Sequence, residues 1–367
     1  MRIILANPRG FCAGVHMAVD VVDLLLDLAG GKPVYVYHEI VHNKHVVLRL
    51  RERGAIFVEA LEAVPEGSMV VFSAHGVSPA IREIAKSRNL TAVDATCPLV
   101  TKVHSEAIRY ARQGYQILLV GHANHQEIVG TRGEAPQATQ VVECPEDIPG
   151  LTIVDPNKLV YLTQTTLSTD DAQVIIDALK AAFPNIKEPP GSDICYATTN
   201  RQMAVRQIAP ECNVVLVVGS TNSSNSVRLT EISANVGTPA YLLDDAPELR
   251  AEWFAGTPGD GRDAVVLVTA GASAPEDLVA NLCRTLLKKY GGSIEQRDIV
   301  PEDVEFGLPL TLKKLMKENG IDPEGKKIRV GAWDINEEHY GADPIAGLGN
   351  ADAVSLTVDG AEATRKK

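Results

Sequence analysis

No stretch of this 367-residue sequence approaches the roughly 18 to 20 consecutive apolar residues that a membrane-spanning helix needs. The opening segment MRIILANPRG has only a four-residue apolar stretch before Asn7 and Pro8, which is too short for a secretory signal. We therefore expect no membrane segment and no signal peptide, and we expect the protein to act in the cytoplasm.

Basic residues are outnumbered by acidic ones. The sequence has 35 Lys and Arg residues against 47 Asp and Glu residues, which gives a formal net charge of -12. A charge of this sign repels polyanions at long range unless a local patch reverses the field. We therefore expect no nucleic-acid partner.

Cysteines are sparse, and no CxxC pair occurs among the six of them. The absence of such pairs excludes a local zinc ribbon and a ferredoxin-type ligand run. Without an export signal, six dispersed cysteines indicate reduced thiols rather than a disulfide framework. Some of these thiols are therefore candidates for binding a metal.

What the sequence does contain is a series of short, continuous apolar runs that alternate with amphipathic stretches. The runs cover residues 3–6, 34–37, 69–74, 116–121, 158–163, 213–219 and 264–271. This pattern is typical of buried parallel strands joined by helices, so the predicted fold class is α/β with mainly parallel sheets. Each run ends in small or polar residues, and ligands in such folds gather at the carboxyl ends of the strands.

Three of the cysteines mark an internal repeat. Spacings of 85 and 98 residues separate Cys12, Cys97 and Cys195, and each of them opens a helix-like segment. Polar residues follow these cysteines at 30, 28 and 30 residues, namely His42, His125 and Asn225. A second set follows at 63, 68 and 78 residues, namely His75, Thr165 and Ser273. Each third of the chain thus supplies one thiol and two polar loops.

The repeat predicts three similar α/β units around a shared centre. Their expected spans are 13–96, 97–194 and 195–298, with residues 1–12 completing the third unit. The pattern stops near Leu310, and we expect residues 299–367 to form a C-terminal extension in which 310–319 is one short helix.

Cys12, Cys97 and Cys195 each lie at a predicted strand-to-helix junction. The helix dipole at such a position favours a thiolate by roughly 0.3–1 kcal/mol. Three thiolates without a fourth ligand suit either a catalytic zinc ion or a cubane iron–sulfur cluster with one iron left open. The alternative for any one cysteine is a buried apolar role, but three of them in register favour a shared metal site.

The polar loops form a second constellation that lacks Lys and Arg. Its members are His42, His75, His125, Ser223, Ser224, Asn225 and Ser273. Loops of this kind at helix starts resemble phosphate cradles, in which a bound anion would hold the histidines protonated. For any one of these histidines, the alternative is a purely structural side chain. For the Ser/Asn loop alone, the alternative is a solvated turn. Glu127 and Thr165 are candidates for proton transfer beside the anion.

Nine motifs occur along the chain in the order NPRGFCAGV, HEIVHN, SAHGVSP, DATCPLV, GHANHQEIVGT, LTQTTLS, ICYATTNRQ, GSTNSSNS and GASAP. Through them the chain resembles the 4-hydroxy-3-methylbut-2-enyl diphosphate reductase family. The resemblance implies three α/β units in a trefoil, pseudo-threefold arrangement around an oxygen-sensitive four-iron four-sulfur (4Fe-4S) cluster.

The resemblance also implies roles for individual residues. It implies cluster ligation by Cys12, Cys97 and Cys195, with Glu127 as the proton-delivering acid and Thr165 as the hydroxyl that assists it. The residues implied in diphosphate binding are His42, His75, His125, Ser223, Ser224, Asn225 and Ser273.

The implied reaction is the reductive dehydration of 4-hydroxy-3-methylbut-2-enyl diphosphate to isopentenyl diphosphate and dimethylallyl diphosphate. This is the last step of the methylerythritol phosphate route to isoprenoids. The implied electron donor is a ferredoxin or a flavodoxin.

Two other functions fit parts of the sequence. A zinc hydrolase acting on a phosphorylated substrate would also use three thiolates and an open position. A redox sensor that loses its cluster would explain the cysteines, but it gives no reason for the His and Ser/Asn loops, and no DNA-binding motif supports it.

Overall fold

Two compact bodies make up the structure, a computed structural model that describes residues 1–323 and 356–357. Body 1 comprises Met1–Phe11, Thr199–Asp303 and residues 356–357. Body 2 comprises Cys12–Thr198 and residues 304–323. Within the described ranges, no helix is long and apolar enough to cross a membrane.

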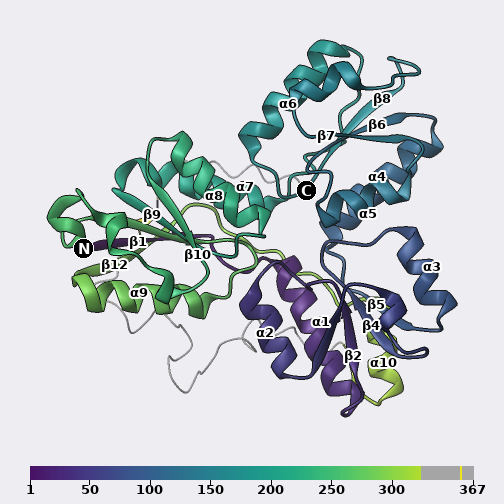
Figure 1. Ribbon diagram of the computed structural model, residues 1–367, viewed down its shortest axis with the longest axis horizontal. Coiled ribbons are helices and arrows are strands. Elements are labelled where there is room, and N and C mark those ends of the chain that lie inside the picture. Colours follow the sequence, from purple (N-terminus) through teal and green to yellow (C-terminus); the bar gives the residue numbers. More distant parts are fainter. Residues whose placement is uncertain (324–355, 358–367) are drawn as a thin grey trace. The chain divides into compact units, whose positions relative to one another are not determined.

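Body 1 is built on a parallel sheet with strand order β10-β9-β11-β1-β12-β13. Its strands are β1 (Arg2–Asn7), β9 (Val214–Val218), β10 (Ala240–Leu243), β11 (Val265–Ala270), β12 (Ser293–Asp298) and β13 (Leu356–Thr357). Its helices are α7 (Tyr196–Ile208), which starts in body 2, α8 (Ser224–Asn235) and α9 (Glu276–Tyr290). In Figure 1 the purple strand β1 lies among the green strands of this sheet, because it pairs with both β11 and β12.

Side chains of β1 alternate between two apolar cores. Ile3 and Leu5 pack in one core with residues of α9, and Ile4 and Ala6 pack in the other with residues of α7 and α8. Successive side chains of a strand point to opposite faces of the sheet. Helices cover both faces here, which explains why the run IILA is apolar at every position.

Body 2 contains two further parallel sheets. One has the order β3-β2-β4-β5 and consists of β2 (Val34–Tyr37), β3 (Ala55–Val58), β4 (Met69–Phe72) and β5 (Thr91–Asp94). The other has the order β7-β6-β8 and consists of β6 (Gln116–Val120), β7 (Thr139–Val142) and β8 (Leu159–Thr163). All pairs in both sheets are parallel.

The helices of body 2 connect and flank these strands. They are α1 (Ala13–Ala29), α2 (Lys44–Glu52), α3 (Pro79–Ser87), α4 (Pro98–Arg112), α5 (Gln126–Glu134), α6 (Thr169–Ala182) and α10 (Leu310–Glu318). Short 3-10 helices of the whole chain occupy Leu61–Ala63, Pro145–Gly150, Ala209–Glu211, Ala246–Glu248, Ala251–Phe254 and Pro258–Gly261.

The predicted α/β class is confirmed, and each of the seven apolar runs contains a strand. The helix expected at 310–319 is also confirmed, as α10. The spans 13–96, 97–194 and 195–298 stay a prediction, and most of the extension 299–367 lies outside the described residues. Sequence patterns missed the other six described strands, β3, β5, β7, β10, β12 and β13. In the first five of these, half-exposed or polar side chains interrupt the apolar pattern.

Helix α1 carries an acidic side chain on its buried face. Asp20 is buried, and burial, with a smaller contribution from the negative charge of Asp23, raises its pKa from 3.8 to about 7. Folding therefore favours the protonated form of Asp20. The energetic penalty for its ionisation begins to appear above the unfolded pKa and is complete once the pH exceeds the folded pKa.

Replacing Asp20 with Asn should make the protein more stable at neutral pH, because the amide has no charge to desolvate. The gain in unfolding free energy over wild type should grow as the pH rises from 4 to 7 and reach at most about 4 kcal/mol. Denaturant unfolding at several pH values measures this difference. Asp27→Asn, at an exposed position of the same helix, is the control, and equal pH profiles for both variants would contradict the assignment.

Candidate functional site

The three repeat cysteines lie together in body 2. Cys12 is the N-cap residue of α1, Cys97 is the N-cap residue of α4, and Cys195 directly precedes α7. A Cβ atom at Gly14 would lie 2.6 Å from the sulfur of Cys97 and 3.9 Å from the sulfur of Cys12. The two sulfurs are therefore no farther apart than the sum of these two distances. Only a glycine at position 14 leaves room for them.

Cys195 belongs to the same electrostatic group. Its sulfur contacts the hydroxyl of Thr198 at 3.1 Å and accepts a hydrogen bond from the Thr198 N–H at 3.3 Å. Burial, and next the charge of Cys12, raises its pKa to about 11. Burial followed by the charge of Cys12 likewise raises the pKa of Cys97 to about 12, and Cys195 adds to that shift.

The helix starts act on Cys97 and Cys195 in the expected direction, but they do not determine the net pKa of these thiols. The backbone N–H groups at the start of α4 do lower the pKa of Cys97, but burial outweighs them. In the metal-free protein these two thiols are therefore protonated at neutral pH, and binding a metal would release their protons.

The arrangement of the thiols bears on the kind of metal centre they fit. Across residues 1–323, no three His, Cys, Asp or Glu groups converge closely enough to hold one metal ion. Three neighbouring thiols are a donor set that a polynuclear iron–sulfur cluster uses, with each sulfur binding a different iron. A zinc ion also takes thiolate ligands, so the donor set by itself fits both kinds of centre.

The three predicted histidines also gather in body 2. His42 follows β2 and precedes the N-cap residue of α2, His75 follows β4, and His125 is the N-cap residue of α5 after β6. The rings of His42 and His75 stack with centroids 4.0 Å apart. The ring of His125 stands edge-on to both, at 5.7 Å from His42 and 6.1 Å from His75.

At least two of these rings are neutral in the ligand-free protein. Burial, and then the neighbouring His42, lowers the pKa of His125 to about 3 and that of His75 well below its usual value. The Nδ1 atom of His125 accepts a hydrogen bond from the N–H of Glu127 at 3.2 Å. The neutral ring therefore carries its proton on Nε2, which is buried without a protein partner in the described part of the chain.

Glu127 and Thr165 meet as a buried pair. The Thr165 hydroxyl donates to the carboxylate oxygens of Glu127, at 3.0 Å from Oε1 and 2.9 Å from Oε2, and the Thr165 N–H donates to Oε2 at 3.0 Å. Burial raises the pKa of Glu127, whereas these hydrogen bonds oppose the rise. Thr165 also accepts a hydrogen bond through its carbonyl from the N–H of Cys195 at 3.0 Å. The carboxyl group is thus tied to the cysteine-bearing segment.

The Ser/Asn loop and Ser273 come together in body 1. Ser223 is the N-cap residue of α8, and its Oγ accepts from the Ser226 N–H at 3.4 Å. The hydroxyls of Ser226 and Ser273 lie 3.0 and 3.3 Å from the same oxygen. Asn225 accepts from the N–H of Ala272 at 2.9 Å, which joins the loops that follow β9 and β11. Ser224 is the first residue of α8.

Comparison with known proteins identifies the family. The LytB protein family model matches residues 3–287. A 4-hydroxy-3-methylbut-2-enyl diphosphate reductase of Rhodopirellula baltica is 51% identical over 318 residues, covering 87% of this chain and 98% of that relative. One of Alcanivorax borkumensis is 52% identical over 317 residues, covering 85% of this chain and 100% of the relative.

The chain belongs to the LytB family.

A solved structure of the same family supports this membership. The E-1-hydroxy-2-methyl-but-2-enyl-4-diphosphate reductase of Plasmodium falciparum shares 40% identity, with a TM-score of 0.83 over 87% of this chain and 98% of that chain. All the predicted site residues lie within the segment that the LytB model matches.

Sequence reasoning missed one histidine that packs against the candidate site. His104, buried on α4, packs against the turn that carries His75, since a Cβ atom at Gly76 would lie 3.0 Å from its ring. Its Nδ1 contacts Glu134 at 3.1 Å, and Glu134 also pairs with Arg82. A lone histidine inside a helix carries no signal of this role, because its partners come from other segments.

Thr165→Val should raise the pKa of Glu127 further, because hydrogen bonds to a carboxylate stabilise its charged form and the valine lacks the hydroxyl. Infrared or NMR titration of the Glu127 carboxyl measures the pKa. Thr166→Val is the matched control, since the Thr166 hydroxyl accepts from Gln164. An unchanged pKa in Thr165→Val would show that this hydroxyl does not hold the carboxylate.

Proposed function

We propose that this LytB-family enzyme reduces 4-hydroxy-3-methylbut-2-enyl diphosphate to isopentenyl diphosphate and dimethylallyl diphosphate. One observation carries the proposal: three thiols, three stacked or edge-on imidazoles and a buried carboxyl gather in body 2. This set supplies a metal centre, an anion site and a proton donor, which are the parts that loss of a hydroxyl from an allylic diphosphate requires.

We assign the metal centre to Cys12, Cys97 and Cys195. A 4Fe-4S cluster held by these residues would supply electrons singly and one Lewis-acidic iron for the substrate. Gly14 supports the assignment, because it keeps the space between two of the sulfurs free of a side chain. The relatives of similar sequence are named as reductases, which favours this assignment over the zinc hydrolase alternative.

We assign diphosphate binding to the three histidines and to the Ser/Asn loop with Ser273. His42, His75 and His125 would bind the anion and take up protons from solvent as they do so, because a nearby negative charge favours the imidazolium. Ser223, Ser224, Asn225 and Ser273 would add neutral donors at the start of α8. The energy of these contacts orients the alcohol, which is remote from the diphosphate.

We assign proton delivery to Glu127. Burial raises the pKa of Glu127, so that it keeps its proton to higher pH than an exposed carboxyl would and can serve as a general acid. Thr165 fixes the carboxyl in one orientation through its hydroxyl and its N–H. Proton delivery at one position lets the hydroxyl group leave as water.

Three further assignments belong to the proposal. The electron donor is a ferredoxin or a flavodoxin, the reaction is the last step of the methylerythritol phosphate route, and the compartment is the cytoplasm. The three units 13–96, 97–194 and 195–298 correspond to the three cysteine-bearing repeats, each of which supplies one thiol and two polar loops.

Anaerobically purified protein should contain iron and acid-labile sulfide, and with a strong reductant it should convert the allylic diphosphate to the two products. Product analysis by chromatography, together with metal counting, measures this. Glu127→Gln should keep the iron and the bound substrate but lose turnover, because its amide cannot act as the acid. One zinc ion per chain without sulfide would favour the hydrolase, and normal turnover of Glu127→Gln would remove that residue from the acid role.

Binding of inorganic diphosphate should be accompanied by proton uptake at pH values above the free pKa of His125, which is about 3, and its affinity should fall as the pH rises through the range of uptake. The reason is that His125 is neutral when free, with a pKa of about 3, and a bound anion raises that pKa. Calorimetry in buffers of different ionisation enthalpy counts the protons. His125→Asn should take up about one proton fewer, and identical counts in the two proteins would assign the uptake elsewhere.

A further inference from the structure

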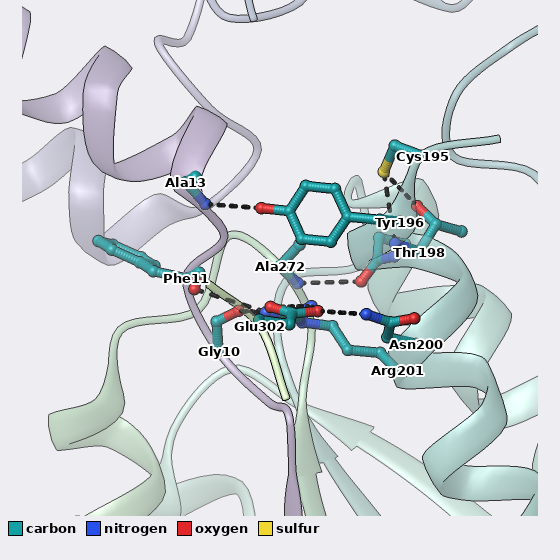
Figure 2. A network of polar contacts seen from close by, with 11 residues as sticks. Gly10, Phe11, Ala13, Cys195, Tyr196, Thr198, Asn200, Arg201, Ala272 and Glu302 are labelled. Carbon is teal, nitrogen blue, oxygen red and sulfur yellow. Dashed lines mark hydrogen bonds and ion pairs between the residues drawn. The ribbon is translucent and has the colours of Figure 1, made fainter. Parts of the chain in front are cut away.

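An arginine without any exposed surface lies in body 1, six residues after Cys195 in the sequence. Arg201 on α7 is 0% exposed. Its Nε and Nη2 donate to the carbonyl oxygen of Gly10 at 3.1 and 2.8 Å, and Nη2 also lies 3.5 Å from the carbonyl oxygen of Phe11. Figure 2 shows the guanidinium reaching these carbonyls from the helix.

The charge of Arg201 is balanced by a residue from beyond the third predicted unit. Nη1 of Arg201 lies 2.9 Å from Oε1 of Glu302, which also accepts from the Asn200 amide at 3.1 Å (Figure 2). Glu302 follows β12 and lies outside residues 3–287, which the LytB model matches. A buried guanidinium needs such a partner, because leaving it unpaired is costly.

The carbonyls that Arg201 holds belong to a backbone turn with little freedom. Gly10 has a left-handed φ of 64°, and its N–H donates to the carbonyl of Ala270 at 3.2 Å. A Cβ atom at Gly10 would lie 3.2 Å from the carbonyl oxygen of Ala274, so the turn is closely packed as well as hydrogen-bonded. The turn is followed immediately by Cys12.

We propose that Arg201 and Glu302 act as positioning residues for Cys12, the first of the three thiols assigned to the cluster. They hold the two residues before Cys12, so that its sulfur is directed before any metal is bound. Within body 2, the N–H of Ala13, the residue after Cys12, donates at 3.3 Å to the hydroxyl of Tyr196. Tyr196 is the first residue of α7, the helix that also carries Arg201. Helix α7 therefore supports the segment around Cys12 on both sides, and this inference rests on the proposed cluster assignment.

The pair Arg201 and Glu302, which we call the clamp, is tested on the anaerobically purified enzyme with the variants Arg201→Gln and Glu302→Gln. Removing groups that orient a metal ligand typically weakens metal binding about 10–100-fold. Both variants should therefore lose iron to a chelator about tenfold faster or more than wild type. The control is Arg297→Gln, which removes another buried arginine of body 1, paired with Glu211 at 2.8 Å and Glu295 at 3.2 Å, away from this turn.

A purely structural role would make all three variants less stable to heat and leave their iron loss alike. Equal iron loss in Arg201→Gln and Arg297→Gln at matched thermal stability would therefore overturn the proposal. If Arg201→Gln fails to fold, Glu302→Gln decides alone, because it keeps the shape of the side chain and removes only its charge.

A second readout does not need the cluster. In metal-free protein, mass spectrometry follows alkylation of Cys12, Cys97 and Cys195 separately, and both clamp variants should speed alkylation at Cys12 alone. Equal acceleration at all three thiols would contradict the clamp. A wild-type protein without iron and sulfide would defeat the cluster assignment, whereas the alkylation pattern would still test the positioning of Cys12.

Discussion

Parallel pairing within each sheet is the constraint on which the site depends. Because all strands of a parallel sheet run the same way, their carboxyl ends lie at one edge, and each must lead into a crossover that is usually a helix. The loops after β2, β4, β6 and β8 carry His42, His75, His125 and Thr165, and the loops after β9 and β11 carry Ser223–Asn225 and Ser273. Within each sheet, residues far apart in the sequence therefore lie at the same edge. They also lie near the starts of helices, where backbone N–H groups are not used by the helix itself.

Burial then determines the charge state of what is gathered there. The same loss of hydration raises the pKa of Cys97, Cys195 and Glu127 and lowers that of His75 and His125, so each of these groups is driven toward its neutral form. A site of this kind receives its charges from its ligands. Metal ions bound to the thiols would displace their protons, and an anion bound by the imidazoles would raise their pKa and so bring protons to them.

The sequence pattern could predict features that repeat along the chain and features formed by consecutive residues. It could not predict roles that depend on contacts between distant segments. The seven buried strands are apolar at successive positions, and the cysteines stand at similar places in successive repeats, so both were recognisable. The half-exposed strands, such as β7 (TQVV), have no such pattern. Gly14, His104 and Arg201 gain their roles only from side chains or carbonyls supplied elsewhere in the fold. The predicted effect of the helix starts on the thiols is present, but burial raises the pKa of Cys97 and Cys195 by more than the N–H groups at the helix starts lower it.

The order of strands also explains why the residues before Cys12 contact the helix that follows Cys195. β1 is first in sequence, yet it lies between β11 and β12, which end the repeated region. That insertion carries Gly10 to the same sheet as α7, where Arg201 reaches its carbonyl and Glu302, just after β12, reaches Arg201. A first strand that paired within the first sheet would not bring Gly10 beside Arg201 in this way. Because the first strand completes the last sheet, the residues just before Cys12 are held by α7, the helix that follows Cys195.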